Sequence, residues 1–453
     1  MGSGIWLASW MLLIAAGCTN VNVAMNGSKT PPENAKLNHT RASATFDVDV
    51  PDQDGYFVGL ALSGGGSRSA NFAAACMFQL QRVGLLQKVD YLSSVSGGSL
   101  AAAYYCLNGR DWNPGVVQQN LTHPFATELI VQTLLMPWNW AALMFTDYDR
   151  GDILAGIFNS VLFTRNGKTL TFADLRPDRP HLLINATDLQ SGRRFVFDDA
   201  TFDQLNSDLS KYPIAYAVTA SSSVPVILHP VTLRDYSTTY PAYRHLIDGG
   251  LADNLGVVSL IDAYAERLAD AKLEHQPDPY PNGAIFIVVD AHREFEKDLS
   301  SARDVGLIDS LMSAFRLTTS SLLNRVSVAT MADLIVRSSP DNATAEQIRQ
   351  EIREISEDGF TQMRDRTEHE VRIVYFSLSQ IERLQNLPFR GFSQSLNSIS
   401  TYFNISNAEA YDLYEAADLL VRQKFEPRLR GMAGELERAA QDRKAKRTQE
   451  RVK

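Results

Sequence analysis

A short apolar run at residues 56–62 leads into three consecutive glycines at positions 64–66. A run of this length bounded by glycines is typical of a buried strand that enters a tight loop. Beyond the loop, apolar residues recur at three- and four-residue spacing from Phe72 to Val83, which predicts an amphipathic helix ending near Gly84. The sequence thus predicts a strand, a glycine loop and a helix in succession.

The same order repeats in the next segment of the chain. The apolar run 91–95 is followed by Ser96-Gly97-Gly98 and by the alanine-rich stretch 100–107. Further strands are predicted at 181–185, 195–197, 284–290 and 371–378, and a helix at 406–423. Alternation of strands and helices is typical of an α/β fold with a mostly parallel central sheet covered by helices. We predict this fold class.

Composition narrows the classes of function. The chain has 453 residues, of which 45% are hydrophobic and 21% charged, as in ordinary globular proteins. No apolar stretch approaches the length of a spanning helix, which excludes a polytopic membrane protein. The net charge of -9 argues against a nucleic-acid partner. Three cysteines are too few for a disulfide scaffold, and the sequence indicates no metal or organic cofactor.

The N-terminus carries one distinctive cysteine. Cys18 follows the apolar run 5–16 and Gly17, and this segment, with small residues before the cysteine, resembles the lipobox of bacterial lipoproteins. The resemblance implies a signal peptide over 1–18 and a lipid anchor on Cys18, with Thr19 compatible with the outer membrane of the bacterial cell envelope. Because no basic residue precedes Lys29, a short membrane-anchored or wrongly predicted N-terminus stays open as the alternative.

Three further segments follow the predicted signal peptide. Residues 19–54 are polar and rich in turn residues, which predicts a flexible tether. Residues 55–426 are expected to form the α/β domain, and residues 427–453 a charged helix. From Asp442 onward this helix has six basic and two acidic residues, so it is either a solvated helix or a contact for anionic lipid headgroups.

Ser96 is the first candidate for chemistry. Ser94-Val95-Ser96-Gly97-Gly98 fits part of a nucleophile elbow, in which a serine on a sharp strand-to-helix turn exposes its hydroxyl. The adjacent glycines permit a strained backbone, and the helix N-terminus directs N–H groups toward developing negative charge. A serine- and glycine-rich turn that merely caps a helix has the same composition and is the structural alternative.

The glycine loop supplies a second candidate. Gly64, Gly65 and Gly66 can direct several backbone N–H groups to one point, as an oxyanion hole requires. The spacings of nucleotide-binding glycine motifs are absent, which argues against a nucleotide site. Arg68 follows in the same loop and could bind an anionic headgroup or hold the loop through a structural ion pair.

Asp248 is the third candidate. It ends the apolar segment Leu246-Ile247 and precedes Gly249 and Gly250, so little side-chain bulk covers its carboxylate.

These three motifs, in this order, resemble the patatin-like phospholipase family. Asn185–Leu189, Ala220-Ser221 with Pro225, and Asn254 also resemble it. The similarity spans about residues 56–256 and continues more weakly to about Val421. It implies a three-layer α/β fold.

The resemblance also implies roles for the candidate residues. Ser96 would be the nucleophile and Asp248 the base of a Ser-Asp dyad, while Gly64, Gly65 and Gly66 would form the oxyanion hole. Two positions depart from the family pattern, Ser94 in the elbow and Ser69 after the glycine loop. A catalytic triad is the internal competitor, and its available histidines after Asp248 are His275, His292 and His369.

The predicted function is a membrane-associated serine lipid acyl hydrolase of the phospholipase A or lysophospholipase type. Its partners would be a phospholipid or other acyl-lipid substrate and a membrane surface reached through the lipid anchor. A non-catalytic lipid-binding or envelope scaffold protein with the same fold is the alternative. A thioesterase or small-ester hydrolase that uses the same residues is a third possibility.

An uncharged interval bears on the substrate. Residues 129–146 contain no charged side chain and include Trp138 and Trp140. Beside the site, such a segment could bind acyl chains or face a bilayer with its tryptophans at the interface. An internal core helix has the same composition and is the interpretation that we favour.

Overall fold

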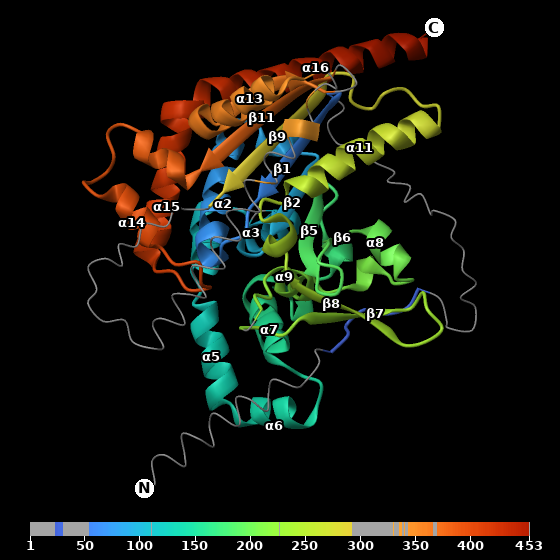
Figure 1. Cartoon of the computed structure of the whole chain (residues 1–453), viewed down its shortest axis with the longest axis vertical. Helices are drawn as coiled ribbons and strands as arrows, with labels where there is room; N and C mark the ends of the chain where they lie inside the picture. The colour runs from blue at the N-terminus through green and yellow to red at the C-terminus, as the bar shows by residue number, and fades with distance from the viewer. Residues whose placement is uncertain are drawn as a thin grey trace.

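The computed structural model describes residues 23–29, 54–109, 111–225, 227–291, 343–365 and 369–452, together with 329, 335–337 and 339. The predicted signal peptide with Cys18, most of the predicted tether, and His292 lie outside the described residues. Figure 1 shows a central sheet with helices on both faces. The predicted α/β class with a mostly parallel sheet is confirmed.

In the described part of the chain, the central sheet has nine strands. Five adjacent strands run parallel to one another, in the order β11 (Glu370–Ser377), β9 (Gly283–Asp290), β1 (Tyr56–Leu62), β2 (Tyr91–Val95) and β5 (His181–Asp188). The antiparallel strands are β10 (Phe360–Arg364) beside β11, β6 (Arg194–Phe197) and β8 (Ala242–Asp248) beside β5, and β7 (Val231–Asp235) beside β8. The carboxyl ends of the parallel strands share one edge, the usual position of ligand sites in such sheets.

Two strands meet end to end at this edge. Val95, the last residue of β2, pairs with Asn185 of β5 in parallel register. The next residue of β5, Ala186, pairs with Asp248, the last residue of β8, in antiparallel register. β6 pairs with both of these β5 residues from the other side. β2 and β8 therefore approach each other along one side of β5, and their last residues lie next to each other.

The sheet separates two parts of the core. Alternate β1 residues belong to different clusters, with Val58 and Leu60 in one and Phe57 and Ala61 in the other. The first face is covered by α2 (Gly66–Arg82), α3 (Gly97–Leu107), α9 (Ile214–Ser221) and α15 (Asn407–Leu420). The second is covered by α11 (Val257–Leu273) and α13 (Ala345–Asp358). Burial on both faces explains why the parallel strands are continuous apolar runs.

The remaining elements connect these layers. They are α4 (Pro114–Leu121), α5 (Phe125–Leu135), α6 (Pro137–Phe145), α7 (Arg150–Leu162), β3 (Thr164–Arg165), β4 (Lys168–Thr169), α8 (Asp199–Gln204), α10 (Gly250–Asp253), α14 (Phe392–Ser398) and α16 (Glu426–Val452). A π-helical segment, Val421–Phe425, joins α15 to α16.

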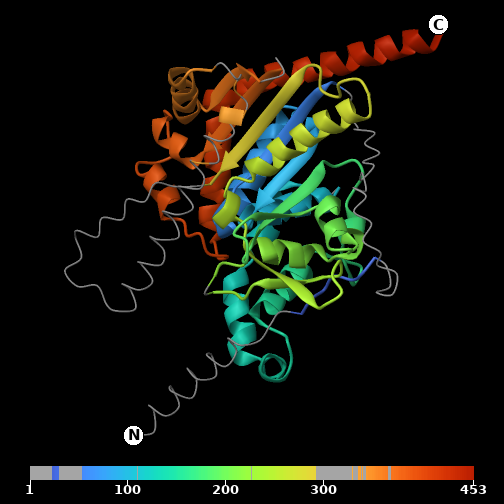
Figure 2. The same cartoon turned by 45° about the vertical axis from the view of Figure 1, so that its right-hand side comes forward.

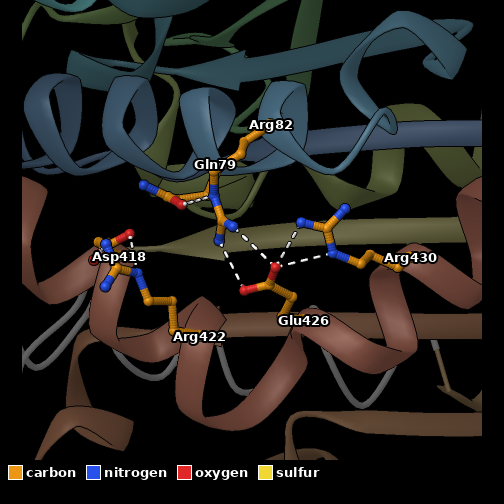
Figure 3. A network of polar contacts seen from close by, with 6 residues as sticks. All are labelled: Gln79, Arg82, Asp418, Arg422, Glu426 and Arg430. Carbon is orange, nitrogen blue, oxygen red and sulfur yellow. Dashed lines mark hydrogen bonds and ion pairs between the residues drawn. The ribbon is translucent and has the colours of Figure 1, made fainter.

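The first part of α16 is attached to the domain. Figure 3 shows Glu426 accepting hydrogen bonds from Arg82 of α2 at 2.9 and 3.1 Å and from Arg430 at 2.7 and 2.9 Å. Leu429 and Leu436 are buried in the first core cluster. The part of α16 beyond residue 441 is mostly exposed and ends far from α6 in Figures 1 and 2.

Residues 23–29 lie within the predicted tether, yet the structure binds them to the domain. The Asn26 side chain donates to the Arg234 carbonyl and accepts from the Arg234 N–H, both at 2.9 Å. Ser28 forms a β-bridge with Ser207. The Asn26 amide thus completes the unpaired edge of β7, which a sequence pattern of polar residues does not reveal.

The uncharged interval forms most of α5 and α6. Figures 1 and 2 show these two helices protruding beyond the sheet. Trp138 and Phe145 are 67% and 83% exposed, so the interpretation of this interval as an internal core helix is wrong. Within the described part of the chain, no helix combines the length and apolar character needed to cross a membrane.

Candidate active site

Ser96 occupies the turn between β2 and α3. Its backbone has φ 49° and ψ −122°, a region that L-residues rarely adopt. Close packing imposes the turn, because a Cβ on Gly97 would lie 1.9 Å from the Gly66 carbonyl oxygen. A Cβ on Gly98 would lie 2.7 Å from the Ser63 carbonyl oxygen. The glycines after Ser96 thus let α3 begin directly against the first loop.

The glycine loop after β1 lies beside this turn. A Cβ on Gly64 would lie 3.4 Å from the Cβ of Ser96, which places the loop against the serine. Gly66 has φ 58°, and a Cβ there would lie 1.7 Å from the Thr401 carbonyl oxygen. The loop is therefore confined between the elbow and residues 401–402.

The N–H groups of the loop differ in availability. The Gly64 N–H donates to the Asn254 carbonyl at 3.0 Å and is thereby already used. Among the described residues, the N–H groups of Gly65, Gly66 and Gly97 have no hydrogen-bond acceptor. Gly97 was not among the predicted donors, although the residue after the nucleophile of an elbow commonly contributes its N–H.

Asp248 faces the serine from the end of β8. One carboxylate oxygen, Oδ1, accepts the Gly250 N–H at 2.8 Å, and the carboxylate also accepts a hydrogen bond from the Ser96 side chain. The residue is only 7% exposed. Burial raises the pKa of Asp248 from 3.8 to about 6, and the hydrogen bonds from Gly250 and Ser96 oppose this rise. The carboxylate is thus a stronger base than an ordinary aspartate.

Ser221 at the end of α9 ties these parts together. Its Oγ accepts the Ser96 N–H at 2.8 Å and donates to the Asn185 carbonyl at 2.6 Å. Its backbone carbonyl accepts the Gly249 N–H at 3.1 Å. The elbow, β5 and the turn after Asp248 are therefore all hydrogen-bonded to one residue. The sequence showed Ser221 only as part of the family resemblance, because its partners are distant in the chain.

The two serines that depart from the family pattern fit the backbone without strain. Ser94 lies within β2, and its Oγ donates to the Leu183 carbonyl at 3.4 Å. Ser69 lies within α2, and its Oγ donates to the Ser63 carbonyl. Neither is among the residues with positive φ. Arg68 is buried and donates to the Ile399 carbonyl at 3.1 Å, so it supports the loop that borders Gly66.

The two candidate triad histidines with described positions, His275 and His369, lie away from Ser96. His369 directly precedes β11 and bonds Asp278 at 2.8 Å, at the amino edge of the parallel strands. His275 is exposed after α11, before β9 begins. The Ser96–Asp248 contact forms without either imidazole.

The fold and the site define an α/β protein with a serine elbow that faces a buried aspartate. Residues 60–261 match the family model described as patatin-like phospholipase. That segment includes the glycine loop, Ser96, Ser221 and Asp248. The chain therefore has the patatin-like α/β fold.

Solved structures with distant similarity include human GIVD cytosolic phospholipase A2, both alone and in complex with methyl gamma-linolenyl fluorophosphonate. The structure of this human protein alone shows 12% identity and a TM-score of 0.45, over 86% of this chain and 61% of the other. The inhibitor complex has 12% identity and a TM-score of 0.44, over 87% of this chain and 60% of the other. VipD from Legionella pneumophila has 12% identity and a TM-score of 0.27, over 80% of this chain and 67% of the other. This chain thus spans about 60% of the human protein's structures. Comparison with the curated proteins gave no match.

Proposed function

We propose that this protein is a membrane-associated serine lipid acyl hydrolase of the phospholipase A or lysophospholipase type. The observation that carries the proposal is the hydrogen bond from the Ser96 side chain to the buried carboxylate of Asp248. The N–H groups of Gly65 and Gly66 lie in the adjacent loop without acceptors among the described residues. The patatin-like phospholipase match over 60–261 supports an acyl lipid as substrate.

In the first half of the reaction, Ser96 Oγ attacks the ester carbonyl carbon as its proton passes to Asp248. The carbonyl electrons move onto the oxygen, and the N–H groups of Gly65, Gly66 and Gly97 stabilise this oxyanion. The tetrahedral intermediate then collapses, the bond to the alcohol oxygen breaks, and Asp248 returns the proton to that oxygen. An acyl ester on Ser96 remains.

In the second half, Asp248 accepts a proton from water as the water oxygen attacks the acyl carbon. Collapse breaks the bond to Ser96 Oγ, which recovers its proton from Asp248, and the fatty acid leaves. Gly64 has a different role, because its N–H holds the loop to the Asn254 carbonyl. The predicted oxyanion hole of Gly64, Gly65 and Gly66 is therefore proposed with Gly97 in place of Gly64.

The proposed location is the bacterial cell envelope, with the chain held by an acyl group on Cys18. The lipobox-like sequence before Cys18 supports this, and Thr19 favours the outer membrane.

A non-catalytic lipid-binding or scaffold protein remains the alternative function. Ser94 and Ser69 depart from the family pattern and would favour this alternative if they disturbed the active-site backbone. Both residues are instead accommodated within regular elements. A small-ester hydrolase would use the same residues and would differ in substrate size.

The test is fatty-acid release from mixed phospholipid vesicles by the full chain. Ser96→Ala and Asp248→Asn are expected to abolish release. Ser377→Ala is the matched control, since it removes a buried serine that ends β11 at the same edge. Release by Ser96→Ala at the parent rate, or no release by the folded parent, would contradict the proposal. Cleavage of soluble thioesters alone would favour the small-ester hydrolase.

A further inference from the structure

The α6 surface is the exposed apolar face of α5 and α6. Its side chains are Ile130, Leu135, Trp138, Trp140, Met144 and Phe145. Leu135 is 64% exposed, comparable to Trp138, and Phe145 is the most exposed of the six. Exposed large apolar side chains that gather in one place mark a contact with a partner or a membrane.

Charge is absent from this surface. Residues 129–146 contain no Asp, Glu, Lys, Arg or His, in a chain with 21% charged residues. Surfaces that bind other proteins usually surround their apolar centre with a polar rim. A set of exposed apolar side chains with no charge among them instead suits a medium that offers few hydrogen bonds or counter-charges.

Two of the three polar side chains of α6 are bonded within the hairpin that α5 and α6 form. Trp140 donates its indole N–H to the Thr133 carbonyl at 2.9 Å. Asn139 donates its side-chain amide to the Gln132 carbonyl at 2.9 Å. These two donors therefore face α5, and the exposed face that includes Trp138 can leave water without breaking their hydrogen bonds.

The base of α5 adjoins the candidate active site. The Ala126 N–H donates to the Phe403 carbonyl at 3.0 Å, and Asn404 and Thr127 bond each other at 2.8 and 3.2 Å. The same loop contacts the oxyanion region, because the Tyr402 carbonyl accepts the Ser67 N–H at 3.3 Å. The hairpin therefore projects from the edge of the sheet that carries Ser96.

The N-terminal segment approaches this same end of the molecule. The Val23 N–H donates to Asp152 in the first turn of α7, which follows α6. Cys18, the predicted site of acylation, is five residues earlier in the sequence. Five residues span at most about 18 Å when extended. An acyl group on Cys18 would therefore hold the end of the molecule that carries α6 close to the membrane.

We propose that the α6 surface enters the interface of a lipid bilayer and directs the Ser96 edge toward the membrane. Trp138 and Trp140 suit the headgroup level, where indole rings are enriched, and Phe145 and Leu135 suit the acyl boundary. The occupant is a lipid surface, since residues 129–146 offer a protein partner no charge, and the exposed indole of Trp138 suits lipid headgroups. As no charge takes part, binding is expected to withstand high salt.

The first experiment places a fluorophore on this surface. The full chain carries Cys18→Ser, which removes the predicted acylation site, and Phe145→Cys labelled with a nitrobenzoxadiazole group. Cys76 and Cys106 are buried and escape labelling. Leu273→Cys is the matched control, because Leu273 is 66% exposed at the end of α11, away from α6 in Figures 1 and 2.

With phosphatidylcholine vesicles, the probe at position 145 is expected to shift its emission to the blue. Lipids brominated on their acyl chains should quench it, while the probe at 273 stays unchanged. A probe at 145 that keeps its aqueous emission with vesicles overturns the proposal. So does a shift without lipid that grows with protein concentration, since it indicates contact between copies of the chain.

The second experiment rests on the proposed function and tests the link to catalysis. Trp138→Ser combined with Phe145→Ser is expected to lower fatty-acid release from vesicles at least about tenfold. Cleavage of a water-soluble short-chain ester should keep its parent rate. Equal loss on both substrates overturns the proposed membrane role. If the parent cleaves neither substrate, the proposed function fails, whereas the fluorophore experiment still decides the membrane contact because it requires no turnover.

Discussion

The backbone conformation of Ser96 is energetically unfavourable, and close packing of the neighbouring residues imposes it. A non-glycine residue in such a region is destabilised by about 1–3 kcal/mol, and glycine avoids most of this. Ser96→Gly is therefore expected to be more stable than Ser96→Ala by about 1 kcal/mol in urea unfolding. Both variants should lose hydrolysis. Equal stability of the two would show that the observed φ of 49° is not a strained conformation.

The carboxylate of Asp248 sets the pH dependence of the first step. Since burial raises the pKa of Asp248 to about 6, the ionised form that accepts the serine proton accumulates above that pH. Cleavage of a soluble ester is expected to rise from acid conditions with a midpoint near pH 6, measured as kcat/KM. A midpoint near the ordinary aspartate pKa of 3.8 would contradict the assignment of Asp248 as the base.

The same pKa shift affects stability. The folded state binds the Asp248 proton more tightly than the unfolded state, so the group's favourable contribution is complete below pH 3.8 and is lost as pH rises through about 6. The difference between 3.8 and 6 corresponds to about 3 kcal/mol. Asp248→Asn carries no charge and is expected to be more stable than the parent at pH 8, with the difference shrinking toward pH 4. Urea unfolding at the two pH values measures this, and a pH-independent difference would contradict it.

At the scale of elements, Ser221 of α9 positions the elbow against β5. Ser221→Ala removes the acceptor of the Ser96 N–H and is expected to lower kcat about tenfold with little change in KM. The labelling rate of Ser96 by a fluorophosphonate should fall in parallel. Ser223→Ala is the matched control, because the Ser223 hydroxyl bonds the Thr219 carbonyl within the same segment. An unchanged kcat in Ser221→Ala would leave this serine a purely structural role.

Local sequence patterns were sufficient to predict the strands and loops nearest the candidate active site. The runs at 56–62 and 91–95 are β1 and β2, and the glycines after them form the predicted loop and elbow. Contacts between distant segments could not be predicted in this way. The Gly64 N–H is used by Asn254, and β8 approaches β2 only because both pair with β5. The composition of 129–146 led us to favour a core helix, which was wrong, because apolar composition does not report what covers a helix.

At the scale of the whole molecule, α6 and the end of α16 lie at opposite ends (Figures 1 and 2). The parallel strands point their carboxyl ends toward α5 and α6. A membrane at the α6 surface therefore leaves the basic end of α16 in water. Lys444→Glu with Lys446→Glu is expected to leave vesicle flotation unchanged. Weaker flotation of this variant would instead assign the headgroup contact to α16.

In the proposed reaction, Ser96 forms a covalent acyl ester that Asp248 helps to make and break. Mass spectrometry of the Ser96 peptide after exposure to a fluorophosphonate tests whether Ser96 is this nucleophile. We expect an adduct on Ser96 in the parent, a much slower adduct in Asp248→Asn, and none in Ser96→Ala. A folded parent without an adduct, or an adduct on another residue at the parent rate in Ser96→Ala, would contradict it.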